Sequence, residues 1–175
     1  MNSKRKNRLS LREICLFGIL AALMFVSKLV MEALPNIHLL GMLTVVYTIV
    51  FRRKALIPIY VYVLLNGLFA GFSAWWVPYL YIWTVLWGAT MLLPRNMPRA
   101  VAVVVYPILC ATHGLLFGVL YAPLQAIMFG FTFEQTLTWI AAGFTFDIIH
   151  MIGNFAVGLL IYPASEALKR FTRAI

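Results

Sequence analysis

The feature that most constrains this chain is the alternation of long apolar runs with short clusters of lysine and arginine. The apolar runs follow one another from residue 14 to residue 161, and the basic clusters lie between them and at the two ends. With 63% hydrophobic and 11% charged residues among 175, a soluble domain would have too little interior to bury the apolar side chains. The sequence therefore predicts an integral membrane protein.

Six of the apolar runs are candidate spans of an all-α protein with a single membrane domain, residues 1–175. No polar stretch is long enough to fold as a second domain. The first run is longer than a usual signal-peptide core and no small-x-small cleavage site follows it, so we expect it to remain as a span. The predicted spans are 14–31, 37–51, 55–72, 79–93, 100–121 and 133–161. Residues 122–132 are too few to cross the membrane, and we expect an interfacial loop or a half-turned helix that caps a cavity.

The distribution of cations predicts the topology. The net charge of +9 could indicate nucleic-acid binding, but the cations flank apolar runs and form no single basic face. The two tails and the clusters at 52–54 and 95–99 hold 13 of the 14 lysine and arginine residues, with Lys28 the exception. The positive-inside rule then predicts a multi-pass protein with both termini in the cytoplasm. Cys15 and Cys110 have no metal-ligand spacing, and we interpret both as packing residues.

Three polar side chains share one face of the last predicted span. At about 100° per residue, Asp147, His150 and Asn154 fall within roughly 60° of one another on a helix. Polar groups at membrane depth are costly, so they usually face the protein interior and serve a function. The small or flexible residues that join this face, and would let a helix or a ligand approach, are Gly143, Met151 and Gly158. The alternative is a buried cluster that only holds helices together.

Further candidate residues lie on the other spans. Tyr79 and Trp83 belong to an aromatic stripe with i, i+4 spacing, which is typical of helix packing and also suits the wall of a binding site. His113 lies on the fifth predicted span, where it could pack or bind. Lys28 and Glu32 are four residues apart on the first span. They could form an ion pair while Lys28 reaches the headgroups, or Lys28 could contact a solute.

The first predicted span carries a pair of small residues, Gly18 and Ala22, with Ala21 adjacent. Small residues four apart permit close contact between membrane helices. The chain as a whole resembles the substrate-binding S component of an energy-coupling factor (ECF) transporter. The resemblance lies in the size, the six spans, the cytoplasmic tails, and the segment Gly18-Ile19-Leu20-Ala21-Ala22 after a basic tail. Gly18 departs from the alanine that the family usually has at this small position, although it preserves the small size.

The resemblance implies uptake of a vitamin or a related water-soluble micronutrient across the prokaryotic plasma membrane. Gly18, Ala21 and Ala22 would contact a transmembrane coupling subunit that is driven by two ATPases. The outer halves of the later helices would form one solute pocket. Its implied members are Tyr79, Trp83, His113, Asp147, His150 and Asn154, with Lys28 added for an anionic solute.

The same resemblance implies that this chain is not an enzyme and binds no cofactor. The sequence has no Walker motif or glycine-rich phosphate loop, so partner subunits would hydrolyse ATP. Metal-specific relatives carry a histidine just after the initiator, and Met1-Asn2-Ser3 has none, which argues against cobalt or nickel as the solute.

Two other functions stay open. A self-sufficient carrier could use Asp147 and His150 to relay protons. An intramembrane enzyme could use the same two residues as an acid/base pair. No internal repeat is evident, so the inverted-repeat design of many carriers finds no support in the sequence.

Overall fold

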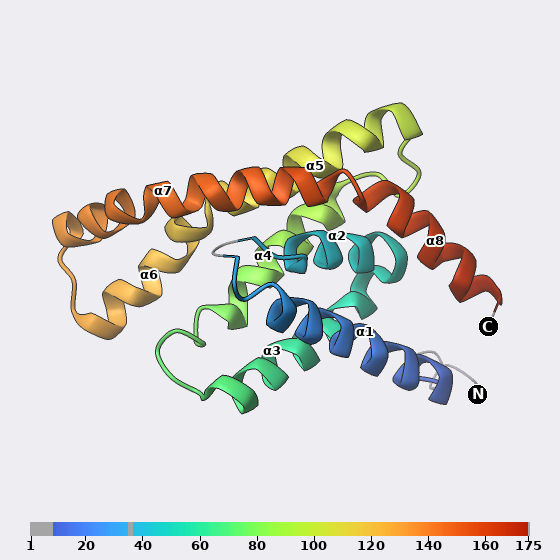
Figure 1. Cartoon of the computed structure of the whole chain (residues 1–175), viewed down its shortest axis with the longest axis horizontal. Coiled ribbons are helices and arrows are strands. Elements are labelled where there is room, and N and C mark those ends of the chain that lie inside the picture. The colour runs from blue at the N-terminus through green and yellow to red at the C-terminus, as the bar shows by residue number, and fades with distance from the viewer. Residues whose placement is uncertain (1–8, 35–36, 175) are drawn as a thin grey trace, which may run out of the picture.

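The computed structural model describes residues 9–34 and 37–174, and every regular element in these ranges is a helix. Figure 1 shows their arrangement. The elements are α1 (Leu11–Val30), α2 (Leu40–Phe51), the 3₁₀ helix η1 (Arg52–Ala55), α3 (Leu56–Ala70), α4 (Tyr79–Leu92), α5 (Arg99–Leu115), α6 (Phe117–Phe129), α7 (Phe133–Gly158) and α8 (Ile161–Ala174).

Three helical stretches in the described ranges are long and apolar enough to cross a membrane, which agrees with the predicted class. They are Leu11–Val30, Arg99–Phe129 and Phe133–Gly158. The helices α2, α3 and α4 have 12, 15 and 14 residues. Each is shorter than the roughly 20 residues that cross the hydrocarbon core unaided. The six-span count and the cytoplasmic position of the termini therefore stay predictions.

The molecule has two distinct ends. The start of α1 and the end of α8 lie at one end, and the α6–α7 hairpin and the 71–78 loop lie at the other (Figure 1). The basic segment η1 is tied to the start of α1, where the Lys54 ammonium pairs with the Glu13 carboxylate. We call the end with the start of α1 and the end of α8 the terminal end, and the end with the α6–α7 hairpin and the 71–78 loop the hairpin end.

Helix α2 lies at the centre of the fold. Residues 40–48 are all buried, and the helix contacts α1, α4, α5, α7 and α8. Its sequence, LGMLTVVYT, is small or apolar on every side, as a helix surrounded by others requires. The Tyr47 hydroxyl donates a hydrogen bond of 3.0 Å to the Leu20 carbonyl, which joins α2 to α1.

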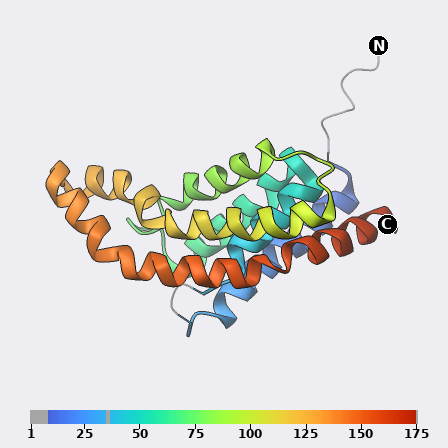
Figure 2. The same ribbon diagram turned by 90° about the horizontal axis from the view of Figure 1, so that it is seen from above.

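The second half of α7 packs closely against α5 (Figure 1, Figure 2). Glycines permit this approach. A Cβ at Gly114 would lie 2.8 Å from Asn154 Nδ2, and a Cβ at Gly158 would lie 2.8 Å from Pro107 Cα. The expected close approach at Gly158 is therefore confirmed, and the neighbour that approaches is α5.

The helices do not end where the predicted fifth span, 100–121, ends. Helix α5 stops at Leu115, the chain bends at Leu116, and α6 continues to Phe129, so a helix extends into residues 122–132, where a loop or a half-turned helix was expected. Side chains from other segments hold α6, because Tyr81 donates to the Leu120 carbonyl. Gly130 then ends α6 in the left-handed conformation, at φ 68°.

The predicted last span, 133–161, is divided differently. Helix α7 begins with a capping box, in which the Gln135 amide donates 3.2 Å to Thr132 Oγ1 and the Thr132 amide donates 2.8 Å to Gln135 Oε1. It ends at Gly158, before the predicted end of the span at residue 161. Pro163 falls in the first turn of α8, where a missing N–H costs little. The predicted basic tail is thus an amphipathic helix.

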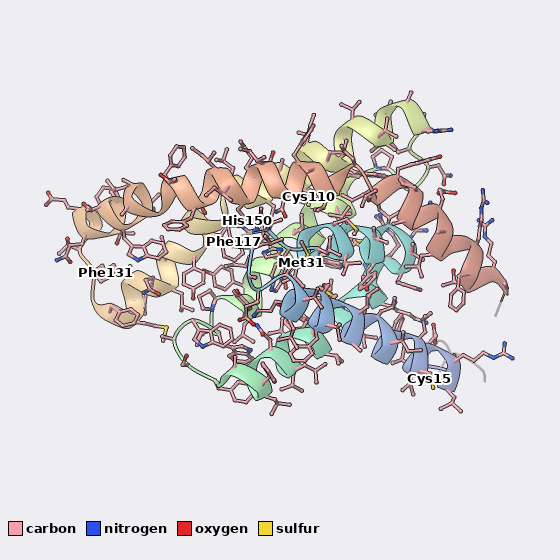
Figure 3. All side chains as sticks on the ribbon, viewed as in Figure 1. Cys15, Met31, Cys110, Phe117, Phe131 and His150 are labelled. Atoms are coloured by element: carbon pink, nitrogen blue, oxygen red, sulfur yellow. The ribbon has the colours of Figure 1, made fainter. Side chains whose placement is uncertain are left out.

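The two cysteines have different surroundings, as Figure 3 indicates. Cys110 is fully buried, so its packing role is confirmed. Cys15 is exposed on α1, and the interpretation of it as a packing residue is wrong for this chain by itself. A helix that packs on one side only exposes the residues of its other side, and Cys15 lies on that other side.

Candidate functional site

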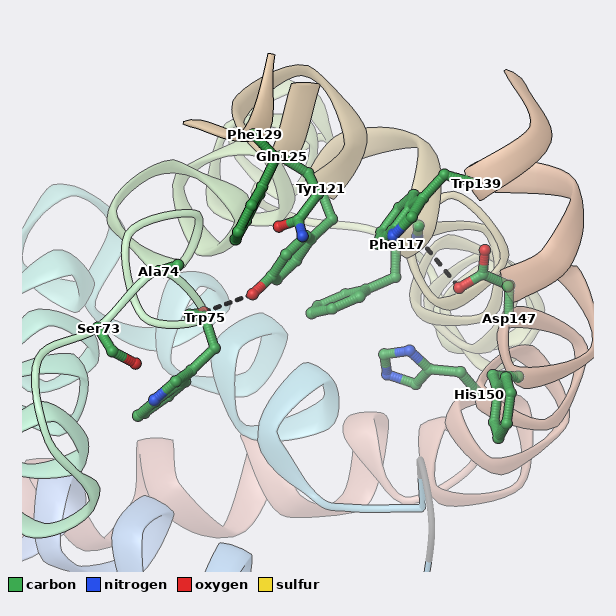
Figure 4. Close-up of a pocket in the computed structure, with 13 residues that line it drawn as sticks. Ser73, Ala74, Trp75, Phe117, Tyr121, Gln125, Phe129, Trp139, Asp147 and His150 are labelled. Carbon is green, nitrogen blue, oxygen red and sulfur yellow. Dashed lines mark hydrogen bonds between the residues drawn. The ribbon is translucent and has the colours of Figure 1, made fainter. Parts of the chain in front are cut away.

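A cavity of about 770 Å³ opens at the hairpin end. Its walls come from the 71–78 loop, α6 and α7 (Figure 4). Six of its lining side chains are aromatic, and the others are small or polar. The lining residues are Ser73, Ala74, Trp75, Phe117, Gly118, Tyr121, Gln125, Phe129, Trp139, Gly143, Phe146, Asp147 and His150.

Asp147 connects the cavity to the start of α6. The Gly118 amide is one of the first N–H groups of α6, which have no partner inside the helix, and it donates 3.1 Å to Asp147 Oδ1. A carboxylate at a helix N-terminus is also favoured by the helix dipole. Asp147 Oδ2 has no hydrogen-bond partner among the described residues. Asp147 is therefore a cap for α6 with one oxygen left for another ligand.

His150 lies one turn beyond Asp147 and is 3% exposed. Its ring contacts Phe117, with centroids 4.9 Å apart, and His38, with centroids 4.8 Å apart. The Nε2 atom is buried and has no hydrogen-bond partner in the part of the chain that the structure describes. Buried polar atoms are normally paired, so this nitrogen is an unusual feature of the layer just behind the cavity surface, whereas the imidazole as a whole borders the cavity.

Aromatic rings form the remaining wall between the loop and the two helices. The rings of Tyr121 and Trp139 stack with centroids 6.0 Å apart, and Phe117 lies 6.2 Å from Tyr121. The Tyr121 hydroxyl donates 2.7 Å to the Trp75 carbonyl, which fixes the 71–78 loop against α6. Figure 4 shows these rings and His150 around one space. The cavity can thus hold a ligand between flat apolar surfaces.

Three sequence-predicted residues form a layer beneath this cavity instead of lining it. Trp83 is 1% exposed, and its ring lies 5.8 Å from both His113 and Tyr79, measured between centroids. His113 Nε2 lies 3.2 Å from the Ile82 carbonyl. Phe117 contacts all three rings from above, so the layer supports the cavity wall. Direct contact of these three with a ligand finds no support in this geometry.

Asn154 and Lys28 also lie away from the cavity lining. The Asn154 amide donates 3.2 Å to the Cys110 carbonyl, so it joins α7 to α5. Lys28 Nζ lies 3.5 Å from Glu32 Oε1, the ion pair that was one of its two interpretations. The described structure therefore separates the polar face of α7 into ligand-accessible residues, Asp147 and His150, and a helix-joining residue.

The three small residues of α1 do not share one environment. Gly18 and Ala22 are exposed, and a Cβ at Gly18 would meet no atom within 4 Å. Ala21 is 0% exposed and packs inside the subunit, so it is not available to touch a partner. The candidate coupling surface is therefore reduced to Gly18 and Ala22.

Several lining residues were missed by the sequence reasoning. Phe117, Tyr121 and Gln125 follow one another at intervals of four on α6, and Trp139 continues the Asp147 face of α7 one turn before Gly143, which the sequence had placed on that face. This spacing was a usable signal, but residues 122–132 were expected to be loop. No group of three side chains suited to hold a metal ion occurs among the described residues.

Comparisons with protein-family models, with curated proteins and with solved structures found no match for this chain.

Proposed function

We propose that this chain is the solute-binding membrane subunit of an ECF-type importer. The observation that carries the proposal is the cavity of about 770 Å³ at the hairpin end, bounded by aromatic rings, by the His150 imidazole and by the Asp147 carboxylate, whose Oδ2 has no partner among the described residues. Its volume and its mixed lining are typical of sites for small organic ligands. The solute is proposed to be a vitamin or a related micronutrient.

The exposed side of α1 supports coupling to a partner subunit. Gly18 and Ala22 lie on this side with apolar neighbours such as Ile14 and Leu23, which are 53% and 49% exposed. Small residues four apart let a second membrane helix come close. The sequence has no P-loop, so the energy for uptake would come from two ATPases that act through a transmembrane coupling subunit.

The two ends of the molecule suit this arrangement. The described cations of η1 and α8 lie at the terminal end, the side that the positive-inside rule assigns to the cytoplasm. The cavity at the hairpin end would then open towards the outer side of the membrane. A solute could bind from outside while α1 engages the coupling subunit.

A self-sufficient proton-coupled carrier is the second candidate, because Asp147 and His150 lie one turn apart in the same cavity wall. Uptake into sealed vesicles separates the two functions. The importer subunit requires the coupling subunit, the ATPases and ATP, whereas the carrier requires only this chain and a pH gradient. Uptake by the chain alone would contradict the proposal.

A matched pair of variants tests the coupling surface. Gly18→Trp adds a large side chain to the exposed face of α1, and Gly88→Trp adds the same side chain to α4, where a Cβ also meets no atom within 4 Å. We expect Gly18→Trp to lower ATP-driven uptake by about tenfold or more, the equivalent of ~1.4 kcal/mol of docking free energy, while solute binding is retained. Gly88→Trp should retain both activities. Equal uptake by the two variants would remove α1 from the coupling surface.

A further inference from the structure

We infer that the cavity selects a flat nitrogen heterocycle that is neutral or positively charged and presents N–H donors, and that it rejects solutes with an anionic group. This inference rests on the proposed solute-binding function and specifies its substrate class. It depends on three features of the cavity, which are its aromatic walls, its free carboxylate oxygen and the absence of a cation from its lining.

The aromatic walls favour a flat solute. Trp75, Phe117, Tyr121 and Trp139 line the cavity from three different segments (Figure 4). Rings bury planar apolar surface efficiently and prefer offset or edge contacts with other rings. Their faces also attract positive charge, so a protonated heterocycle gains where an anion does not.

The free oxygen of Asp147 can accept a hydrogen bond from an N–H group of the solute. Gly118 occupies only Oδ1 of the Asp147 carboxylate and leaves Oδ2 without a partner among the described residues. The His150 imidazole, one turn further along α7, borders the same space, although its Nε2 atom is buried. An N–H group of a heterocycle that bonds to a carboxylate forms a charge-assisted hydrogen bond, which is stronger than a neutral one.

The third feature concerns charge. No lysine or arginine is found among the cavity-lining residues of the described chain. Lys28 pairs with Glu32, and the other described cations belong to the start of α1, to η1, to the 93–98 connection, to the start of α5 and to α8. A carboxylate or phosphate group in the cavity would face Asp147 with no compensating cation. Uncompensated charge in a site of low polarity is strongly unfavourable, so anionic solutes are excluded.

Three probes with one ring system test this selectivity. They are 2-aminobenzimidazole, which presents an amidine edge, benzimidazole, and benzimidazole-5-carboxylate, which adds an anionic group. Binding to the purified full chain in detergent is measured by isothermal titration. We expect 2-aminobenzimidazole to bind roughly ten- to a hundredfold more tightly than the carboxylate, with benzimidazole between them.

Two charge-removing substitutions on α7 assign the preference to the cavity. Asp147→Asn keeps an oxygen that can cap α6, because asparagine and aspartate are similar caps, but it removes the charge. It should reduce 2-aminobenzimidazole binding by roughly tenfold or more, and it should not weaken binding of the carboxylate. Glu134→Gln removes a charge from the exposed first turn of α7, outside the cavity lining, and should preserve the wild-type preference.

Any of three results would overturn the inference. The carboxylate could bind as tightly as 2-aminobenzimidazole or more tightly, 2-aminobenzimidazole could show no measurable binding, or Asp147→Asn could leave the preference unchanged. Mass spectrometry of the solute that co-purifies with the chain gives an independent result. An anionic solute would overturn the selectivity and retain the proposed function. Uptake that needs no coupling subunit would overturn the proposed function and leave the selectivity intact.

Discussion

The substitution Gly118→Ala tests the candidate site with the smallest change in volume. A Cβ at position 118 would lie 2.3 Å from Asp147 Oδ2 and 3.2 Å from its Cγ. Non-bonded heavy atoms reach their optimal contact at about 3.5 Å, so the carboxylate must move by roughly 1 Å. Because Asp147 bonds to the amide of the same glycine, this movement strains or breaks the bond that orients the carboxylate.

The expected effect on stability is the difference of two terms. Loss of the 3.1 Å bond from Gly118 to a carboxylate costs about 1.5–3 kcal/mol. Alanine in place of a helical glycine stabilises by about 0.5–1 kcal/mol. The net destabilisation should therefore be about 0.5–2.5 kcal/mol. If the displaced carboxylate also binds solute, affinity should fall by roughly ten- to a hundredfold.

The assay combines a melting curve with a binding isotherm for the co-purifying solute. Gly143→Ala is the matched control, because Gly143 lines the same cavity and a Cβ there meets no atom within 4 Å. The control should gain up to about 1 kcal/mol of stability and retain its affinity. Normal affinity in Gly118→Ala, together with a lowered melting temperature, would show that Asp147 only caps α6.

Three further expectations concern residues outside the cavity and the topology. Asn154→Ala should lower the free energy of unfolding by about 1–3 kcal/mol with no change in solute affinity, because it removes the 3.2 Å hydrogen bond to the Cys110 carbonyl. A loss of affinity without a loss of stability would instead show that Asn154 binds the solute. Lys28→Ala should change stability by less than about 1 kcal/mol and leave affinity unaltered in the same two assays, since it removes only a partly exposed ion pair. Single cysteines introduced into a Cys15→Ala background test the topology. A cysteine at Asn96 should react with a membrane-impermeant reagent only from the cytoplasm, and a cysteine at Ser73 only from outside. External labelling at Asn96 would contradict the six-span topology.

Hydropathy predicted the all-helical membrane class because a membrane helix depends on the average composition of about 20 residues and little on the identity or contacts of any one of them. The first span, predicted as 14–31, is found as Leu11–Val30. The capping box that starts α7 was also predictable, since both of its bonds form within four residues of the chain. Features that depend on a few neighbouring residues, such as the capping box, or on the average hydropathy of a span could therefore be predicted from the sequence.

The residues at which α5 and α6 end could not be predicted from the sequence. Residues 122–132 were expected to form a loop or a half-turned helix because they are too few to cross the membrane, but contacts from Tyr81 and Tyr121 to distant backbone hold residues 117–129 as a helix. The loop expectation in turn hid the α6 wall of the cavity.

The sequence placed the polar residues of α7 on one face, but it did not indicate which half of that face borders the cavity. Helical periodicity places Asp147, His150 and Asn154 on one side, and it does not say where a neighbouring helix ends. Close packing of α5 at Gly114 covers Asn154, whereas the bend at Leu116 turns α6 away beside Asp147. The cavity therefore begins where α5 stops, and the face extends towards Trp139 instead of towards Gly158.

The bend at Leu116 also explains why stability and affinity must be measured together. It creates a new helix N-terminus at α6, whose amides lack partners, and the Asp147 carboxylate supplies one. The same carboxylate keeps its second oxygen on the cavity wall, so removal of the side chain would disturb α6 and the cavity together. Only substitutions that separate the two roles of Asp147, as a cap for α6 and as part of the cavity wall, are informative. Asp147→Asn retains a cap without the charge, and Gly118→Ala retains the charge but displaces it.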